Sequence, residues 1–153
     1  KYGVFIGIID LLKAYLPVVV CLNLTQNNIF LACLVGGGVI IGHIHPFFMN
    51  FKGGKGMSSY FGMILGLDFT FGLLLLLIAA ILLMITNYVA IATILILIIV
   101  PLREYFLSNL NTISADYILC LSLLSFLIFL KHMENLIKIK NGEETTFWSV
   151  FKK

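Results

Sequence analysis

The sequence predicts an all-α protein that crosses a membrane several times, built as one integral membrane domain over residues 1–153. Hydrophobic residues make up 61% of the 153 residues and charged residues 11%, whereas soluble domains have roughly 45–50% and about 25%. A water-soluble fold of this size could not bury so much apolar surface, and disordered chains are poor in apolar residues. Both the soluble globular class and the disordered class are therefore excluded.

The first long run without charged residues, Ala14–Phe51, predicts parts of two spans. A charged side chain costs about 2.5–3.5 kcal/mol at the centre of a membrane helix, so uncharged runs mark spanning segments. The polar segment Asn23–Asn28 breaks this run, which leaves one span near Val4–Leu22 and another near Ile29–Ile44. The next apolar run, Met57–Leu67, is too short to cross a bilayer unaided, and two interpretations stay open: a short helix packed on its neighbours, or a re-entrant segment.

The uncharged run Phe69–Leu102 predicts a helical hairpin. As one helix it would be roughly 51 Å long, whereas the hydrocarbon core is only about 30 Å thick. It must therefore fold back at its polar break, Thr86–Tyr88, and we expect Pro101 to end its second half. The three spans expected in the rest of the chain are Thr70–Ile85, Val89–Leu102 and Tyr117–Leu130.

The lysines predict the orientation, because positive charge favours the cytoplasmic side. With Lys1 inside, Lys52 and Lys55 are also inside, and the tail is inside only if Met57–Leu67 counts as a crossing. The loop left outside, Arg103–Ala115, has one Arg and one Glu. The tail lysines are Lys131, Lys138, Lys140, Lys152 and Lys153. The charge pattern therefore favours about six short transmembrane helices.

Two charges lie within the first span. Asp10 and Lys13 are three residues apart, so they share a helix face and can pair. Charges at that depth face a protein interior or an aqueous cavity. Two interpretations stay open: a self-neutralising contact between helices, or the wall of a polar cavity.

No metal site is expected. Cys21, Cys33 and Cys120 stand in apolar stretches without the spacing of a zinc site or a disulfide framework, which is typical of small apolar residues in helices. His43 and His45 are two residues apart and would not face each other on a helix. A structural hydrogen bond is the favoured role for either histidine.

Three glycines and two lysines stand together in Lys52–Gly56. Glycines allow backbone N–H groups to face an anion, and lysines supply positive charge. A helix beginning near Met57 would add its positive amino-terminal end, so the segment fits a phosphate site. As a bare motif it fits a cytoplasmic turn equally well. Gly56 follows Lys55 where a nucleotide-hydrolysing P-loop has Ser or Thr, which argues against that class.

The tail carries a second polar group. If the last span continues as a helix, His132 and Asn135 share a face near the membrane surface. A histidine can act as a general base or hydrogen-bond donor, and an asparagine can hold a carbonyl or hydroxyl group. An ordinary amphipathic juxtamembrane helix explains the same residues, and we expect Asn141-Gly142 to end it.

Together these segments resemble a known family. Gly42–Gly56, followed by His132-x-x-Asn135 and Asn141-Gly142-x-Glu144, closely resembles the acyl-phosphate-dependent glycerol-3-phosphate acyltransferases of bacterial membranes. Ile9–Lys13 and Thr86–Val89 look like family segments at matching positions. The resemblance covers essentially the whole chain, and its GHxxPxFxxFKGGKG motif is highly specific.

The resemblance implies a compact seven-helix enzyme of the bacterial inner (cell) membrane with its active site facing the cytoplasm. It implies transfer of a fatty acyl group from acyl phosphate to the C1 hydroxyl of glycerol 3-phosphate, giving lysophosphatidate and phosphate for phospholipid synthesis. The implied partners are glycerol 3-phosphate, acyl phosphate and membrane lipids. No metal, other cofactor or nucleic acid is implied.

The resemblance also implies roles for particular residues. Phosphate binding is carried over onto Lys52, Gly53, Gly54, Lys55 and Gly56. His132 and Asn135 would be catalytic and would orient the attacking hydroxyl and the acyl carbonyl. His43 and Glu144 would be structural, near the site. Whether His132 or the donor's own phosphate takes the hydroxyl proton stays open.

The chain departs from the family pattern in three places. An earlier motif rich in Gly, Ser, Asn and Arg, whose Ser and Arg bind substrate, has no match, and Lys1 lies just downstream of where it should end. One helix is missing with it, which predicts an amino-terminally truncated fragment, inactive if that motif is required. Asn87 stands where Arg is expected, and Met57–Ser59 replaces a more usual Val-Ala-Thr; both changes look tolerable.

Two other function classes compete with this interpretation. A non-enzymatic membrane transporter or binder of a phosphorylated metabolite or lipid would use Lys52–Gly56, the glycine–lysine loop, without chemistry, so that His132 and Asn135 would be dispensable. An acyltransferase that uses acyl-CoA is the third class, but nothing in the sequence resembles its His-x-x-x-x-Asp motif.

Overall fold

The structure, a computed structural model, describes residues 2–108 and 114–151. These two stretches contain six α-helices and two short 3₁₀ helices, with no strand in either. In chain order the helices are α1 Tyr2–Leu24, α2 Ile29–Ile44, η1 Phe47–Met49, α3 Met57–Leu67, α4 Phe69–Thr86, α5 Val89–Ser108, α6 Ala115–Lys140 and η2 Phe147–Phe151. The all-α prediction is confirmed. Lys1, Lys152 and Lys153, which entered the orientation argument, lie outside the described residues.

Five helices are long and apolar enough to cross a membrane: α1, α2, α4, α5 and α6. Their outer faces keep large apolar side chains exposed; on α4, for example, Leu73, Leu77 and Ile81 are each about half exposed. Lipid solvates such a surface, whereas water does not, and helices satisfy their own backbone hydrogen bonds in lipid. The chain is therefore a multi-pass integral membrane protein.

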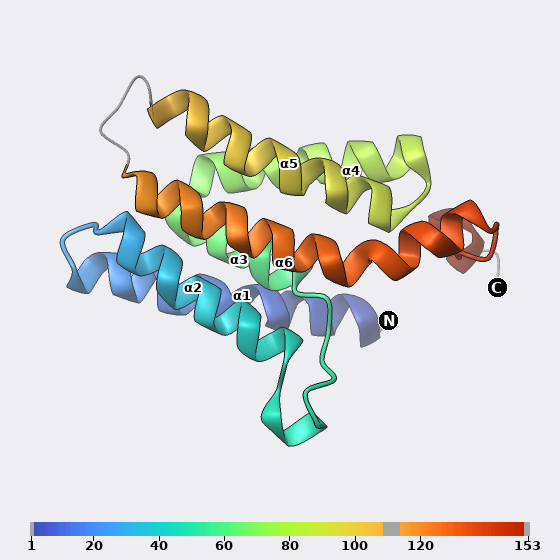
Figure 1. Cartoon of the computed structure of the whole chain (residues 1–153), viewed down its shortest axis with the longest axis horizontal. Coiled ribbons are helices and arrows are strands. Elements are labelled where there is room, and N and C mark those ends of the chain that lie inside the picture. Colours follow the sequence, from blue (N-terminus) through green and yellow to red (C-terminus); the bar gives the residue numbers. More distant parts are fainter. Residues whose placement is uncertain (1, 109–113, 152–153) are drawn as a thin grey trace.

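The short helix α3 completes a sixth crossing. Its 11 residues reach only about half-way through the hydrocarbon core at about 1.5 Å per residue. The connection from α2 extends away from the bundle and returns to it, and α3 then runs to the end of the bundle where α4 starts (Figure 1). The α2–α3 connection, the α4–α5 turn and the carboxyl end of α6 consequently lie toward one end of the bundle. This path agrees with the six crossings that the lysines predict.

The expectation that Pro101 ends a helix is wrong. α5 continues through Pro101 to Ser108, so the expected outer loop Arg103–Ala115 is helical at its start, and α6 begins at Ala115. A proline removes one backbone donor from a helix, but packing in a membrane bundle can compensate for the loss.

Side chains beyond Pro101 show what holds this last part of α5. Arg103 donates a hydrogen bond of 2.8 Å to Asp68, which caps the amino end of α4. Arg103 also pairs with the buried Glu104, and its guanidinium lies 4.1 Å above the centre of the Phe71 ring. These contacts fasten α5 to α4 at the end of the bundle opposite the α2–α3 connection.

Helix α3 lies at the centre of the bundle and packs closely on α1. A Cβ atom on Gly62 would strike the Leu11 carbonyl oxygen, so the two backbones approach as closely as only small residues allow. On another face, the fully buried Tyr60 hydroxyl lies 2.7 Å from Ser125 Oγ of α6. The amino end of α3 is thereby fixed between α1 and α6.

The last helix ends where the sequence predicts. α6 continues well beyond Leu130 to Lys140, and Asn141 is its C-cap. The Gly142 N–H donates to the Ile139 carbonyl oxygen at 3.0 Å with Gly142 at φ 72°, a conformation that glycine adopts without strain. The chain then turns back toward the α4–α5 turn.

Candidate active site at the amino end of α3

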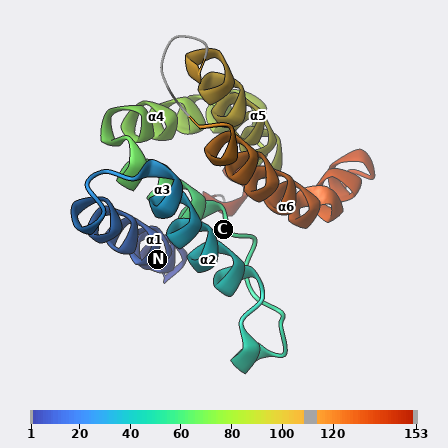
Figure 2. The same cartoon turned by 60° about the vertical axis from the view of Figure 1, so that its left-hand side comes forward.

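The connection between α2 and α3 extends away from the bundle and then doubles back onto the end of α2 (Figures 1 and 2). The Gly53 N–H donates to the Ile44 carbonyl oxygen at 3.1 Å, and the Gly54 N–H donates to the His43 carbonyl oxygen at 3.2 Å. A Cβ at Gly53 would lie 2.5 Å from Pro46 Cδ, and one at Gly54 would strike the His43 imidazole. Close packing therefore requires glycine at both positions.

Free backbone donors are found at the amino end of α3 instead. Gly56 is the N-cap, with φ 88°, and among the described residues no side chain caps this helix. The first N–H groups of an α-helix have no partner within the helix, and this end carries a partial positive charge. The prediction that a helix begins at Met57 and points its amino end into the loop is confirmed.

Lys55 joins the loop to α6. Its ammonium donates to Asn135 Oδ1, and Asn135 Nδ2 donates to Glu144 Oε1 at 2.7 Å. Lys55 is exposed and Asn135 is half-buried, so a ligand can approach them from outside the protein. The structure thus brings together three residues that the sequence singles out in separate segments.

His132 lies one helical turn before Asn135 and is buried. Its Nδ1 is 2.9 Å from the Ile128 carbonyl oxygen. A carbonyl oxygen only accepts hydrogen bonds, so Nδ1 carries a proton, and in the neutral ring Nε2 is the free acceptor. His132 and Asn135 are three residues apart on α6 and so share a helix face, and Asn135 contacts Lys55. We treat His132, Lys55 and Asn135 as one group for this reason.

Lys52 lies apart from this group. It is exposed and lines a hollow of about 550 Å³ between the amino half of α1 and the end of α2, together with Asp10, Lys13 and His43. Gly53 and Gly54 line the same hollow, which we call the α1–α2 hollow. The glycine segment thus separates two sites, with Lys55 on one side and Lys52 on the other.

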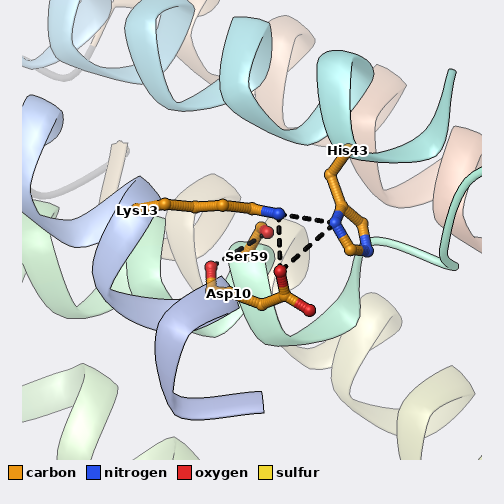
Figure 3. A network of polar contacts seen from close by, with 4 residues as sticks. All are labelled: Asp10, Lys13, His43 and Ser59. Carbon is orange, nitrogen blue, oxygen red and sulfur yellow. Dashed lines mark hydrogen bonds and ion pairs between the residues drawn. The ribbon is translucent and has the colours of Figure 1, made fainter. Parts of the chain in front are cut away.

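Asp10 and Lys13 serve both of the roles that their spacing leaves open. Lys13 Nζ donates to Asp10 Oδ1 at 2.6 Å and lies 2.6 Å from His43 Nδ1, so the pair ties α1 to α2 (Figure 3). The same side chains line the α1–α2 hollow. His43 thus makes a hydrogen bond of the kind expected for a histidine, and its structural role stays a prediction.

Sequence reasoning missed how the carboxyl tail docks. The backbone N–H of Phe147 donates to the Asn87 carbonyl oxygen at 2.9 Å, and that of Trp148 donates to Asn87 Oδ1 at 3.0 Å. Asn87 itself has φ 60° at the α4–α5 turn, where asparagine is favoured among non-glycine residues. The polar break Thr86–Tyr88 was the only signal, and it indicated a turn without indicating its partner.

The cysteines lie within α1, α2 and α6, as expected. Cys33 and Cys120 place their sulfur atoms 3.4 Å apart between α2 and α6. Within residues 2–108 and 114–151, no three side chains of His, Cys, Asp or Glu gather as a set of metal ligands.

Comparison with known proteins identifies the family. The family profile described as glycerol-3-phosphate acyltransferase matches residues 1–142. The chain belongs to this family. Among its curated relatives, the glycerol-3-phosphate acyltransferase of Colwellia psychrerythraea is 34% identical over 137 residues, or 90% of this chain. The one of Photobacterium profundum is 31% identical over 139 residues, or 91% of this chain.

These relatives are longer than the chain, which spans 66% and 65% of their lengths. A family member with a solved structure has the same fold. The crystal structure of PlsY, an integral membrane glycerol 3-phosphate acyltransferase, in its glycerol 3-phosphate form superposes with a TM-score of 0.87 at 25% identity. That alignment covers 100% of this chain and 76% of the PlsY chain.

Proposed function

We propose that this protein transfers a fatty acyl group from acyl phosphate to the C1 hydroxyl of glycerol 3-phosphate, giving lysophosphatidate and inorganic phosphate. The observation that carries the proposal is the contact of Lys55 with Asn135 beside the uncapped amino end of α3. It combines cationic groups for a phosphate with polar groups for an acyl carbonyl. Membership of a family named for acyl transfer to glycerol 3-phosphate supports the same reaction.

In this proposal the substrate phosphate binds at the amino end of α3. Lys55 supplies an exposed positive charge, and the N–H groups that follow Gly56 supply directed donors, which together suit a phosphate dianion. Lys52 adds positive charge on the other side of the loop. Gly53 and Gly54 contribute by allowing the loop to pack against α2, since their own N–H groups are already used.

The chemical step replaces the mixed-anhydride bond of acyl phosphate with an ester bond to glycerol 3-phosphate. The C1 hydroxyl oxygen attacks the acyl carbonyl carbon, a new C–O bond forms, and the C–O bond to the phosphate breaks. Asn135 Nδ2 is a donor for the developing negative charge on the carbonyl oxygen, which is stabilised by preorganised donors. The hydroxyl proton passes to His132 Nε2 or to the departing phosphate, and both routes balance the reaction.

An apolar groove next to this group suits the acyl chain. A cavity of about 270 Å³ lies between α3, α4 and α5, and Met57, Phe61, Leu83 and Ile96 are among its lining residues. Met57 is the first residue of α3, so the groove begins where the proposed phosphate site ends. An acyl phosphate lying there would have its phosphate at the helix end and its chain toward the membrane interior.

The proposed site faces the cytoplasm across a bacterial inner membrane. The α2–α3 connection, which contains Lys52 and Lys55, lies toward the same end of the bundle as the carboxyl end of α6 (Figure 1), and Lys138 and Lys140 belong to the last turn of α6. Clustered lysines favour the cytoplasmic side. Membrane lipids surround the apolar faces, and both phosphorylated substrates would reach the site from this side or from the adjoining leaflet.

A direct test offers two donors separately to membranes that contain the natural protein. Acyl phosphate and acyl-CoA are each supplied with labelled glycerol 3-phosphate, and labelled lysophosphatidate is measured. We expect product from acyl phosphate alone. Product from acyl-CoA alone would overturn the donor assignment, and no product from either donor with an inserted protein would favour transport or binding of a phosphorylated compound.

A further inference from the structure

The contacts of His43 connect the loop to charges on another helix. His43 Nδ1 lies 2.6 Å from Lys13 Nζ and 3.5 Å from Asp10 Oδ1 (Figure 3). Asp10 and Lys13 compensate each other's charge, with 2.6 Å between the ammonium nitrogen and the carboxylate oxygen. Such a pair is tolerated at this depth because its net charge is zero.

The short distance to Lys13 decides the protonation of the His43 ring. A lysine ammonium has three donors and no acceptor. A proton on Nδ1 would face that ammonium at 2.6 Å, donor against donor, so Nδ1 must be the acceptor. The neutral ring then carries its proton on Nε2.

The Nε2 side of the same ring lies against the loop. A Cβ atom on Gly54 would strike His43 Nε2, and His43 Cδ2 would be 3.1 Å away. The Gly54 N–H also donates to the His43 carbonyl oxygen at 3.2 Å. His43 therefore contacts Gly54 in two ways, through a backbone hydrogen bond and through close packing of its ring. The contact of Nδ1 with Lys13 sets the orientation of that ring.

The same turn of α1 also fastens the other end of the loop. Ser59 in the first turn of α3 donates through Oγ to the Asp10 backbone carbonyl oxygen at 3.0 Å (Figure 3). The glycine–lysine loop thus passes beside His43 of α2 and enters α3 just before Ser59. His43 and Ser59 both contact the turn of α1 that contains Asp10 and Lys13.

We propose that Asp10 and Lys13 hold His43 as the Nε2–H tautomer and that these three residues position the loop for binding the substrate phosphate. They are positioning residues, since their contacts are with the loop and with one another. The tautomer stands on geometry alone, whereas the effect on substrate binding rests on the proposed function.

Nitrogen-15 NMR of histidine side chains tests the tautomer without any substrate. The chain has three histidines, and a His43→Gln variant assigns the signal of His43 in protein reconstituted in lipid. We expect His43 to show an unprotonated Nδ1 and a protonated Nε2. In Lys13→Met we expect a mixture of both tautomers, whereas Lys13→Arg should keep the single form. A protonated Nδ1 or a mixture in the unchanged protein would overturn the proposal.

Kinetics test the positioning role. In Lys13→Met, the KM for glycerol 3-phosphate should rise about tenfold, the size expected when a hydrogen bond to a charged group is lost, while kcat changes much less. Lys13→Arg should recover most of the affinity. Lys138→Met, at an exposed position of α6, should leave both constants unchanged.

The two measurements separate the two claims. An unchanged KM in a Lys13→Met protein that inserts normally would overturn the positioning role. Absence of acyl transfer in the unchanged protein would instead overturn the proposed function, and the NMR measurement would still decide whether Lys13 fixes the His43 tautomer.

Discussion

Asn135 is the residue on which the proposed chemistry depends most. It accepts a hydrogen bond from Lys55 and donates one to Glu144. The Glu144 carboxylate fixes which end of the amide faces Lys55, because a carboxylate only accepts and an ammonium only donates. The orientation of the amide is therefore set before any substrate binds, which is the condition for preorganised stabilisation of developing charge.

Replacing Asn135 by alanine should abolish most turnover without preventing insertion. We expect kcat to fall by about 10²–10³-fold, the typical effect of removing one donor to a developing oxyanion. Initial rates of lysophosphatidate formation measure the loss. Glu134→Ala is the matched control, since its side chain is exposed on the adjacent position of the same helix. Full activity in Asn135→Ala would remove this residue from the catalytic group.

Lys55→Ala should act mainly on substrate binding. We expect the KM for glycerol 3-phosphate to rise by about 10–100-fold, because hydrogen bonds between charged groups contribute about 1.5–3 kcal/mol. The amount of protein inserted in the membrane should stay the same. Lys140→Ala provides the control from the exposed carboxyl end of α6. An unchanged dependence on glycerol 3-phosphate concentration would show that Lys55 lies outside the site.

At the scale of helices, uncharged runs predicted the elements well, because each span must be apolar to lie in lipid. α2 and α3 have the predicted bounds, and α1 and α4 differ from them by one or two residues at each end, whereas α6 extends well past the predicted span to Lys140. Pro101 misled the prediction, since the contacts of Arg103 with Asp68 that hold the end of α5 join residues 35 apart. No local pattern contains such a contact.

The close approach of α3 to α1 gives a prediction about stability. Gly62→Ala would place a methyl group against the Leu11 carbonyl oxygen, and overpacking of this kind costs about 1–3 kcal/mol. Thermal unfolding of the detergent-solubilised protein should occur at a lower temperature. Gly38→Ala is the matched control, because its Cβ would have nothing within 4 Å and alanine favours a helix. Equal unfolding temperatures for the two variants would contradict the packing described here.

At the scale of the whole molecule, the site joins parts of the chain that are far apart in sequence. Asn135 of α6 contacts both the glycine–lysine loop and the carboxyl tail. On its other side the loop packs against α2, which is joined to α1 by the contact of Lys13 with His43. The residues of this group were predicted from motifs that resemble a family. Their contacts were not, because Lys55 and Asn135 are 80 positions apart and Lys13 and His43 are 30 apart.

The role of the loop glycines also needed the structure. The glycines in this segment predicted backbone N–H groups that face an anion. In the structure, the N–H groups of Gly53 and Gly54 instead donate to carbonyl oxygens of α2. The backbone N–H groups without a partner in the helix are those of the first turn of α3, which begins without a side-chain cap. A sequence motif shows that the backbone approaches something closely, but it does not show whether that is a ligand or another part of the protein.

A double-mutant cycle on Lys55→Ala and Asn135→Ala tests the central claim, that the loop and α6 form one acyl-transfer site. The value of kcat/KM for acyl transfer from acyl phosphate is measured for the unchanged protein, both single variants and the double variant. Because the two side chains share a hydrogen bond, we expect a coupling energy of about 0.5–3 kcal/mol, so that the double variant loses less than the product of the single losses. Losses that simply multiply, in proteins that insert equally well, would contradict a shared site.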